Sequence, residues 1–464
     1  MRDAESSDRE GVLCMPINLA PAKRPLLRGG EPGLLSTVSA MKTNALSALG
    51  RHTSEPAISW LMHAALAHPH LISLAAGFTD NESLPVAEAR ALLNEILRSR
   101  RRGRAALQYG TTLGDPKLRQ LTARHLQRLD GVRGNPAAYS SERVIITSGS
   151  QQLLYMVTEA LCDAGDIVLV EDPTYFVYLG ILQSHGVRAR GVRLKRDGLD
   201  LAHLEAMLER FKRTGTLRRV KLLYLVSYYQ NPTGATTSFA KKRAVLALLK
   251  QYERAAGHPI YLVEDAAYRE LRFSGSEVKS ALAVRGSSER VIFAGTYSKP
   301  FATGVRVGFG SLPEPVFTTV ARIKGNHDFG TANLLQQLLA HALASDRYDR
   351  HLRLLRRRYA RKALVMKRAL VAHFPKAVEW WEPTGGLYFW ARLPRGLASG
   401  AKSKLFETAL AHHVLYVPGE LCYAEDSTRR KPDHEMRLSF GNASEANIRK
   451  GIERLSAVLR EMLP

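Results

Sequence analysis

Between residues 143 and 310, short apolar runs alternate with longer amphipathic stretches, and this alternation limits the folds open to the chain. The apolar runs are continuous and rich in β-branched and aromatic residues: RVIIT, DIVLVED, KLLYLVS, IYLVED, RVIFAG and VRVGFG. Helical patterns lie between them, such as QLLYMVTEALCDAG, LAHLEAMLERFKR and FAKKRAVLALLKQYERAAG. Continuous apolar strands that alternate with helices are typical of a mostly parallel sheet covered on both faces. The sequence therefore predicts an α/β fold.

The pattern changes after about residue 344. A long basic helix is expected over residues 347–373, followed by a strand in GGLYFWARLP, a helix in LFETALAHH, a strand in MRLSF and a last helix over residues 445–463. This order predicts a smaller α+β unit. Ahead of the sheet region, residues 34–49 and 57–68 have helical patterns. Residues 1–33 are polar, aperiodic and dotted with Gly and Pro, which predicts a mobile extension.

The chain is strongly basic, with 67 Lys and Arg against 43 Asp and Glu and a formal net charge of +24. The excess is spread over RSRRRGR, RARGVRLKR, FKRTGTLRR and RLLRRRYARK, on expected helix faces and loops. No DNA- or RNA-binding motif accompanies these runs. We interpret them as an arginine-rich solvated surface without a nucleic-acid partner, and nonspecific affinity for polyanions is the alternative.

Cysteine usage and hydropathy bear on the compartment. Cys14, Cys162 and Cys422 stand far apart in no metal-ligand spacing, which fits free thiols in a reducing compartment and no metal site. The N-terminus lacks the apolar segment of a secretory signal. Residues 56–79 are uncharged, but three histidines and a proline interrupt them, so we expect a helix and then a strand rather than a membrane span. A cytoplasmic protein with no membrane partner is the expectation.

Small or aromatic residues follow the first two expected strands. The turn at residues 148–151 reads SGSQ and opens a helix, so backbone N–H groups and the helix dipole can meet an anion there. An ordinary N-cap explains the same serines. Tyr175 ends EDPTY after the next strand, where its ring can lie flat against a planar ligand or pack into the core.

Two polar side chains come at the ends of the next strands. Asn231 precedes a proline in QNPTG, which holds it out of the helical region and directs its amide; a turn alone does not require Asn. Asp265 ends the strand IYLVED, and Tyr268 follows three residues later. A carboxylate at that place needs a partner, either a cationic ring nitrogen or a nearby arginine.

The stretch GTYSKPFATGVRVGF holds Lys299 after one strand and Arg306 before the next. A surface lysine is the ordinary explanation of Lys299. If it faces the same sheet edge as the other polar residues, burial would lower the pKa of its amine and make it reactive. All five groups of residues lie at the carboxyl end of an expected strand or just before one, and ligands bind at that edge of open α/β sheets.

In this combination the chain resembles the class I/II aminotransferases of the fold type I pyridoxal-phosphate enzymes, and within them the branch of 2-aminoadipate and kynurenine aminotransferases. The similarity runs from about residue 35 to the C-terminus and includes SLAAGFTDNESLP, LQYGTTLGDPKLRQ, PTGGLYFWARLP, VLYVPGELCY and MRLSFGNAS. It implies a mostly parallel seven-stranded sheet sandwiched by helices, plus a smaller α+β domain. The parts expected are a mobile extension (1–33), a segment joining the small domain (34–75), a large domain that binds pyridoxal phosphate (76–344) and a small C-terminal domain (345–464).

The resemblance also implies roles for residues. Lys299 would carry the cofactor as a Schiff base and later move the proton, Asp265 would pair with the pyridine N–H⁺, and Tyr175 would stack on the ring. The other cofactor contacts would be Asn231 and Tyr268 at the phenolic oxygen, Ser150, Gln151, Thr296, Ser298 and Arg306 at the phosphate, and Tyr109 at the phosphate of the neighbouring subunit. The substrate contacts would be Gly77, Asn231 and Arg437, with Leu84 in the same selecting region. Arg437 would grip the α-carboxylate.

The implied activity is transfer of an amino group from an L-amino acid, dicarboxylic or aromatic by branch, to a 2-oxo acid such as 2-oxoglutarate, in a homodimer. A β-lyase or related eliminating enzyme would use the same residues. A regulator that senses pyridoxal phosphate would need a winged-helix domain, and about 35 residues ahead of LLSTVSAMK are too few for one. The chain departs from the family in carrying Thr303-Gly304-Val305-Arg306 where Pro-Gly-Leu-Arg is frequent, and in placing Pro300 directly after the lysine.

Overall fold

The structure is a computed structural model that describes residues 45–56, 59, 61, 70–134, 136–286, 288–426 and 429–463. From Ala48 onward the chain forms one compact unit. The mobile extension expected at residues 1–33, and most of the two helices expected before residue 70, lie outside the described residues. The division between a large and a small domain at residue 344 stays a prediction.

In the described part of the chain, the main sheet has eight strands in the order β2-β9-β8-β7-β6-β3-β4-β5. They are β2 (Val144–Thr147), β3 (Ile167–Asp172), β4 (Arg188–Lys195), β5 (Gly198–Leu199), β6 (Val220–Val226), β7 (Tyr261–Asp265), β8 (Val291–Thr296) and β9 (Gly308–Ser311). Neighbours from β8 through β4 pair in parallel, while β9 is antiparallel to β8 and β2. The predicted mostly parallel sheet is confirmed. It has one strand more than expected, because the two-residue β5 turns back along the end of β4.

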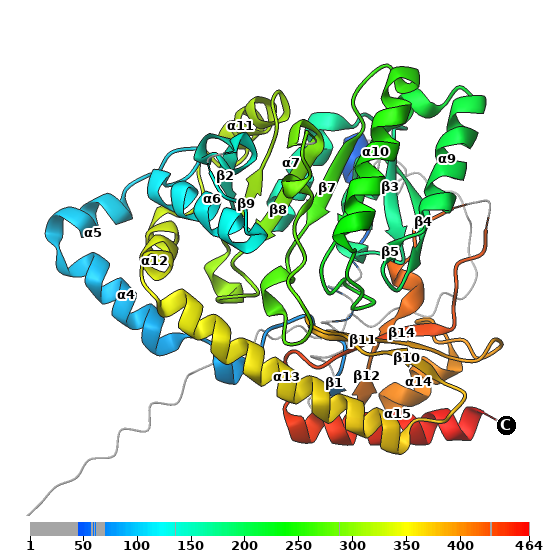
Figure 1. The fold of residues 1–464 in the computed structure, drawn as a ribbon. Coiled ribbons are helices and arrows are strands. Elements are labelled where there is room, and N and C mark those ends of the chain that lie inside the picture. The colour runs from blue at the N-terminus through cyan, green and yellow to red at the C-terminus, as the bar shows by residue number, and fades with distance from the viewer. Residues whose placement is uncertain are drawn as a thin grey trace, which may run out of the picture. The chain divides into compact units, whose positions relative to one another are not determined.

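Strands β2, β6, β7 and β8 are buried almost throughout, which requires cover on both faces of the sheet. Helices supply that cover (Figure 1). Those of this region are α2 (Ala48–His52), α4 (Val86–Arg98), α5 (Arg100–Leu107), α6 (Pro116–Asp130), α7 (Ser150–Leu161), α8 (Phe176–Ser184), α9 (Leu201–Arg213), α10 (Phe239–Ala256), α11 (Val316–His327) and α12 (Asn333–Ala344). None of the helices in the described ranges is long and apolar enough to cross a membrane.

A second sheet of four antiparallel strands, in the order β10-β11-β14-β13, lies at the carboxyl edge of the main sheet (Figure 1). Its strands are β10 (Glu379–Trp381), β11 (Tyr388–Arg392), β13 (Val417–Pro418) and β14 (Glu435–Ser439). Two short strands, β1 (Ile72–Ser73) and β12 (Val414–Leu415), pair in parallel. The helices beside these strands are α13 (Arg347–His373), α14 (Lys404–Ala411) and α15 (Glu445–Met462). The strands and helices expected after residue 344 are thus all present.

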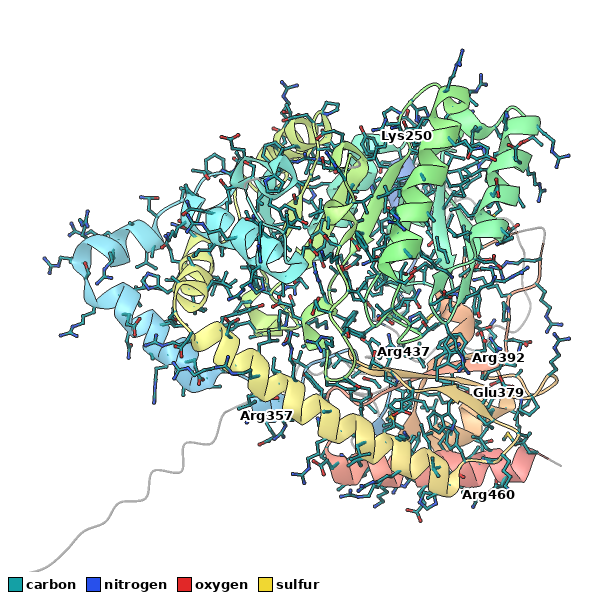
Figure 2. All side chains as sticks on the ribbon, in the orientation of Figure 1. Lys250, Arg357, Glu379, Arg392, Arg437 and Arg460 are labelled. Atoms are coloured by element: carbon teal, nitrogen blue, oxygen red, sulfur yellow. The ribbon has the colours of Figure 1, made fainter. Side chains whose placement is uncertain are left out.

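Helix α13 explains how a very basic segment packs. Its buried side chains recur at helical spacing, for example Leu352, Leu355 and Tyr359, and this stripe faces the protein interior. Arg357 between them extends outward into solvent (Figure 2), whereas Arg356 and Arg358 are half-buried and bond to Glu270 and Asp80. The basic run therefore forms a solvated face on an ordinary amphipathic helix.

Strands β4 and β9 show why the sequence prediction missed or misplaced strands. β4 is not among the predicted strands, because its arginines leave only Val192 fully buried and hide the apolar pattern. β9 begins at Gly308 rather than at residue 305, because Thr303–Val305 form a 3₁₀ turn. Arg306 ends that turn in the left-handed region, at φ 50°, which reverses the chain before the strand starts.

Candidate active site

The carboxyl ends of β6, β7 and β8 open into a cavity of about 240 Å³. The strands end together because Asp265 pairs in register with Val226 on one side and Ala294 on the other. The predicted site residues that line the cavity are Gly77, Ser150, Gln151, Tyr175, Asn231, Asp265, Tyr268, Thr296, Ser298, Lys299, Arg306 and Arg437. The structure thus gathers all but two of the residues named from the sequence.

The two exceptions are Tyr109 and Leu84. Tyr109 is 83% exposed, and its ring meets that of Phe329 edge to face at 5.4 Å. Leu84 lines a different cavity, next to α13. Tyr109 thus does not line this cavity, and its contact with the phosphate of a neighbouring subunit, which the family resemblance implies, stays a prediction.

Lys299 projects into the cavity rather than into solvent. Its Nζ donates a hydrogen bond to the carbonyl oxygen of Gly77 at 2.6 Å and lies 6.0 Å from the centre of the Tyr268 ring. Among the described residues, no carboxylate forms an ion pair with this amine. Burial, together with the positive charges of Arg437 and Arg306, lowers the pKa of Lys299 to about 8. At pH 7 about a tenth of such amines are unprotonated, far more than of a lysine with its ordinary pKa, and a nucleophile requires this form.

Asp265 is the acidic group of the cavity and is 3% exposed. Its Oδ2 accepts a hydrogen bond from the Tyr224 hydroxyl at 2.8 Å, and its Oδ1 accepts one from the Ala267 N–H at 3.0 Å. Burial raises the pKa of Asp265 to about 6, although both hydrogen bonds oppose the shift. No described arginine pairs with it, so the alternative of an arginine partner does not hold for this part of the chain. The carboxylate is placed to receive a cation from a ligand.

The turn between β2 and α7 forms a cradle for an anion. Gly149, the N-cap residue, has φ +81° and offers no side chain to the first amides of α7. A Cβ at Gly149 would lie 2.8 Å from Arg306 Nη2, and one at Gly308 would lie 2.4 Å from the Ser150 nitrogen. Both glycines are therefore needed for the arginine and the next strand to approach the helix N-terminus. Uncapped amides facing a guanidinium favour a phosphate group.

Arg437 comes to the cavity from the second sheet, on the side that faces the main sheet (Figure 2). It is 1% exposed, and its two terminal nitrogens donate to Asn231 Oδ1 and to the Ala75 carbonyl oxygen, each at 2.6 Å. Its guanidinium lies 4.3 Å from the centre of the Tyr388 ring and 5.7 Å from that of Phe176. Its Nε–H is buried without a partner among the described residues, which leaves a donor for a carboxylate.

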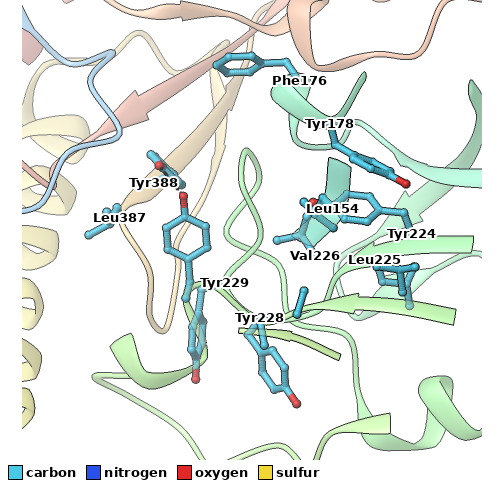
Figure 3. Close-up of a cluster of buried hydrophobic side chains, with 14 of the residues drawn as sticks. Leu154, Phe176, Tyr178, Tyr224, Leu225, Val226, Tyr228, Tyr229, Leu387 and Tyr388 are labelled. Carbon is cyan, nitrogen blue, oxygen red and sulfur yellow. Dashed lines mark hydrogen bonds between the residues drawn. The ribbon is translucent and has the colours of Figure 1, made fainter. Parts of the chain in front are cut away.

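Four aromatic residues of the site were not predicted from the sequence. Phe78, Phe176 and Tyr388 line the cavity, and Tyr224 holds Asp265 from behind. Figure 3 shows Tyr224 next to Tyr178, with Phe176 and Tyr388 nearer the second sheet. The signal for Tyr224 was available, because a tyrosine within the apolar strand KLLYLVS needs a partner for its hydroxyl.

Comparisons with known proteins identify the family of the chain. Residues 69–455 match the family described as aminotransferase class I and II. The chain is 33% identical over 393 residues to aromatic-amino-acid aminotransferase 1 of Thermococcus litoralis (84% of this chain, 88% of that protein). It is 32% identical over 397 residues to 2-aminoadipate transaminase of Thermus thermophilus (85% and 91%). The crystal structure of Pyrococcus horikoshii kynurenine aminotransferase, in complex with PMP, superposes with a TM-score of 0.83 at 30% identity, covering 92% of this chain and 100% of that one.

Proposed function

The chain belongs to the class I and II aminotransferase family and is a pyridoxal-phosphate-dependent enzyme; from this premise we propose that it moves the amino group of an aromatic or dicarboxylic L-amino acid to a 2-oxo acid such as 2-oxoglutarate. One observation carries the proposal. Within the described residues, a half-buried lysine without a carboxylate partner, a buried aspartate without a cation and a buried arginine with a free donor line the same cavity. These three groups match an aldehyde, a ring nitrogen and a substrate carboxylate.

The residues of the cavity fit pyridoxal phosphate at each of its polar groups. The cradle at Gly149 and Arg306 supplies donors for the phosphate, to which we add Ser150, Gln151, Thr296 and Ser298. Asp265 would hold the proton on the ring nitrogen, and Asn231 and Tyr268 would donate hydrogen bonds to the phenolic oxygen. Tyr175, half-buried on the cavity wall, would lie against the ring face.

Each catalytic step then depends on a residue of this chain. Pyridoxal phosphate, when bound, supplies the electron sink that stabilises negative charge at the substrate Cα. The Lys299 amine would bind the cofactor and, once displaced by the amino acid, take the proton from Cα and return it to the cofactor carbon. The Arg437 guanidinium would bind the α-carboxylate through paired N–H donors. This clamp fixes which bond of Cα stands perpendicular to the cofactor ring, and so makes proton removal the favoured step.

The lining of the cavity favours an aromatic donor. Phe78, Phe176 and Tyr388 supply apolar surface beside Arg437. Among the described residues, the cationic groups of the lining are Lys299, Arg306 and Arg437, and the proposed mechanism already uses each of them. A second carboxylate on the substrate would thus find no remaining cation in the described lining, whereas an aromatic ring would find rings to pack against.

We also propose that the enzyme is a homodimer in the cytoplasm. Tyr109, Leu107 and Phe329 are all more than half exposed, and apolar side chains in such numbers favour cover by a partner surface. In a dimer, Tyr109 would reach the phosphate of the other subunit. Sedimentation of the wild type and of Tyr109→Phe, which keeps the ring, tests the assembly separately from the phosphate contact.

The decisive experiment records the visible spectrum of the purified holoenzyme while single amino acids are added. An aromatic amino acid should remove the absorbance of the bound aldehyde cofactor, and 2-oxoglutarate should restore it. Analysis of the products distinguishes the chemistry, because transfer yields an oxo acid and a new amino acid, whereas elimination releases ammonia. Ammonia release without a new amino acid would refute the proposal.

Replacing Arg437 tests where the substrate carboxylate binds. Arg437→Ala should lower kcat/KM by roughly 100-fold, since two hydrogen bonds to a charged carboxylate are lost. The cofactor should stay bound, which its absorbance after gel filtration would show. Loss of cofactor and of substrate affinity to the same degree would contradict the role assigned to Arg437.

A further inference from the structure

Tyr388, on strand β11, contacts three parts of the cavity: Tyr268, Arg437 and the loop at Gly77. Its hydroxyl oxygen is 2.9 Å from that of Tyr268, and the two rings meet edge to face at 5.6 Å. Its ring faces the Arg437 guanidinium at 4.3 Å. A Cβ added at Gly77 would lie 3.0 Å from its hydroxyl oxygen, so the side chain also fits closely against the loop whose carbonyl accepts from Lys299.

We propose that Tyr388 is a positioning residue whose hydroxyl donates to the Tyr268 oxygen, so that Tyr268 directs its own proton at the phenolic oxygen of the cofactor. The inference rests on the proposed function, in which Tyr268 faces that oxygen. It adds a second tyrosine behind the first, supplied by the other sheet of the molecule.

Counting protons sets the direction of this hydrogen bond. A neutral phenol has one O–H to donate and can accept as well. Burial raises the pKa of Tyr268, so Tyr268 keeps its proton. If Tyr268 gave that proton to Tyr388, none would remain for the cofactor. The 2.9 Å contact and a bond from Tyr268 to the cofactor coexist only when Tyr388 is the donor.

The surroundings of Tyr388 agree with that direction. Tyr388 is 1% exposed, and within the described residues Tyr268 is the one hydrogen-bond partner of its hydroxyl. A buried hydroxyl proton needs an acceptor, and the Tyr268 oxygen is in place to serve. A donor behind Tyr268 polarises its O–H and strengthens the bond that it makes in front, by about 10–30% per bond in a chain.

The ring and the hydroxyl of Tyr388 have separable effects. The ring supports Arg437 and is kept in Tyr388→Phe, whereas the hydroxyl acts on Tyr268 and is lost. Tyr388→Leu loses both. The hydroxyl should therefore govern the titration of the cofactor, and the ring should govern capture of the amino acid.

The test is a pH titration of the cofactor absorbance in the holoenzyme without substrate. Four proteins are compared: wild type, Tyr388→Phe, Tyr268→Phe and the double variant. A hydrogen bond to the phenolic oxygen stabilises its negative charge, so Tyr268→Phe should raise the titration midpoint. Tyr388→Phe should raise it by less, about 0.3 to 0.5 pH units. The double variant should match Tyr268→Phe, because the second tyrosine has nothing left to act on.

The other charged groups at the cavity, Lys299, Asp265, Arg306 and Arg437, are the same in all four proteins. Tyr416→Phe is the control, since its buried hydroxyl donates to the Ser399 carbonyl at 3.0 Å rather than to a cavity residue. It should leave the midpoint where the wild type has it.

Three results would overturn the inference. The first is an unchanged midpoint in Tyr388→Phe, and the second is a Tyr388→Phe shift that persists when Tyr268→Phe is already present. The third is a KM for the amino acid that rises as much in Tyr388→Phe as in Tyr388→Leu, where about tenfold is expected from loss of a buried cation–π contact. If instead Tyr268→Phe leaves the midpoint unchanged, the role of Tyr268 is wrong and the inference falls with it, while the amino-transfer assay still decides the proposed function independently.

Discussion

Two neighbouring carboxylates on strand β7 have opposite surroundings. Glu264 and Asp265 point to opposite faces of the sheet, as successive strand residues do. Glu264 Oε1 lies 2.8 Å from Lys242 Nζ, with both side chains fully buried. Asp265 is held by a hydroxyl and an amide and has no cationic partner among the described residues. A buried charge that is paired within the chain serves the fold, whereas a carboxylate at a cavity without a counter-charge indicates where a cationic group of a ligand can bind.

Two lysines, the fully buried Lys242 and the half-buried Lys299, repeat the contrast. Lys242 Nζ faces Glu264, donates to the Lys279 carbonyl at 3.0 Å and lies 3.8 Å from the centre of the Tyr228 ring. Lys299 Nζ has a carbonyl acceptor and, within the described residues, no carboxylate. Burial lowers the pKa of both amines, so burial alone does not distinguish them. The two lysines differ in whether the amine has a carboxylate partner. Exchanging each lysine for methionine tests that difference.

Lys299→Met should have the largest effect. Amino transfer should fall by about 10⁴-fold or more, because the group that moves the proton is gone. The thermal midpoint of the cofactor-free protein should not decrease, since a half-buried amine without a carboxylate partner among the described residues is replaced by an apolar chain of similar shape. Turnover assays check the loss of activity, and calorimetry checks the thermal midpoint. A variant that turned over at the wild-type rate would remove Lys299 from the site.

Lys242→Met should lower stability and leave turnover nearly unchanged, the reverse of Lys299→Met. It leaves Glu264 buried without a counter-charge and should lower the free energy of unfolding by about 3 to 5 kcal/mol. The turnover of each folded molecule should stay within about twofold of wild type, because Lys242 lies on the face of the sheet away from the cavity. Denaturant titration gives the first quantity, and kcat per bound cofactor gives the second.

The control for Lys242→Met is the double variant Lys242→Met, Glu264→Gln. Removing the unpaired charge should recover much of the lost stability. If Lys242→Met instead abolished turnover while the protein stayed folded, the contrast between the two lysines would be wrong.

Asp265→Asn should have a smaller effect on turnover than loss of Lys299. An amide cannot stabilise a positive ring nitrogen, so kcat should fall by roughly 100-fold. Stability of the cofactor-free protein should change little. The Tyr224 hydroxyl can still donate to the amide oxygen, and removal of a buried unpaired charge offsets the lost acceptor of the Ala267 N–H. Glu264→Gln is the matched variant on the other face and should cost stability rather than turnover. Equal kinetic losses in the two variants would break the comparison.

The sequence predicted the site residues that lie at the ends of strands. Asp265 and Lys299 could be placed because continuous apolar strands such as those at residues 261–265 and 291–296 fix where each strand stops. The family motifs, rather than any spacing, brought Arg437 into the site. Strand β4 escaped prediction because its arginines are exposed at the edge of the core.

The partners of the predicted residues could not be read from the sequence. Tyr388 lies 120 positions from Tyr268 and meets it only where the two sheets come together. Lys242, on a helix, meets Glu264 only across the packed face of β7. Sequence patterns report burial and strand ends, but which charges meet depends on tertiary packing between distant elements.

The smallest effect expected is on the pH dependence of stability in the cofactor-free protein. The pKa of Lys299 falls from 10.5 to about 8 on folding. Between these values the unfolded amine keeps its proton and the folded one has released it, so stability rises with pH across that window. Lys299→Met removes this contribution, and the difference between its thermal midpoint and that of wild type should narrow as the pH rises from about 8 to about 10. A difference that stayed constant would mean that the Lys299 amine has an anionic partner in solution. Lys299 and Lys242 would then both be paired, and the contrast between them would be wrong.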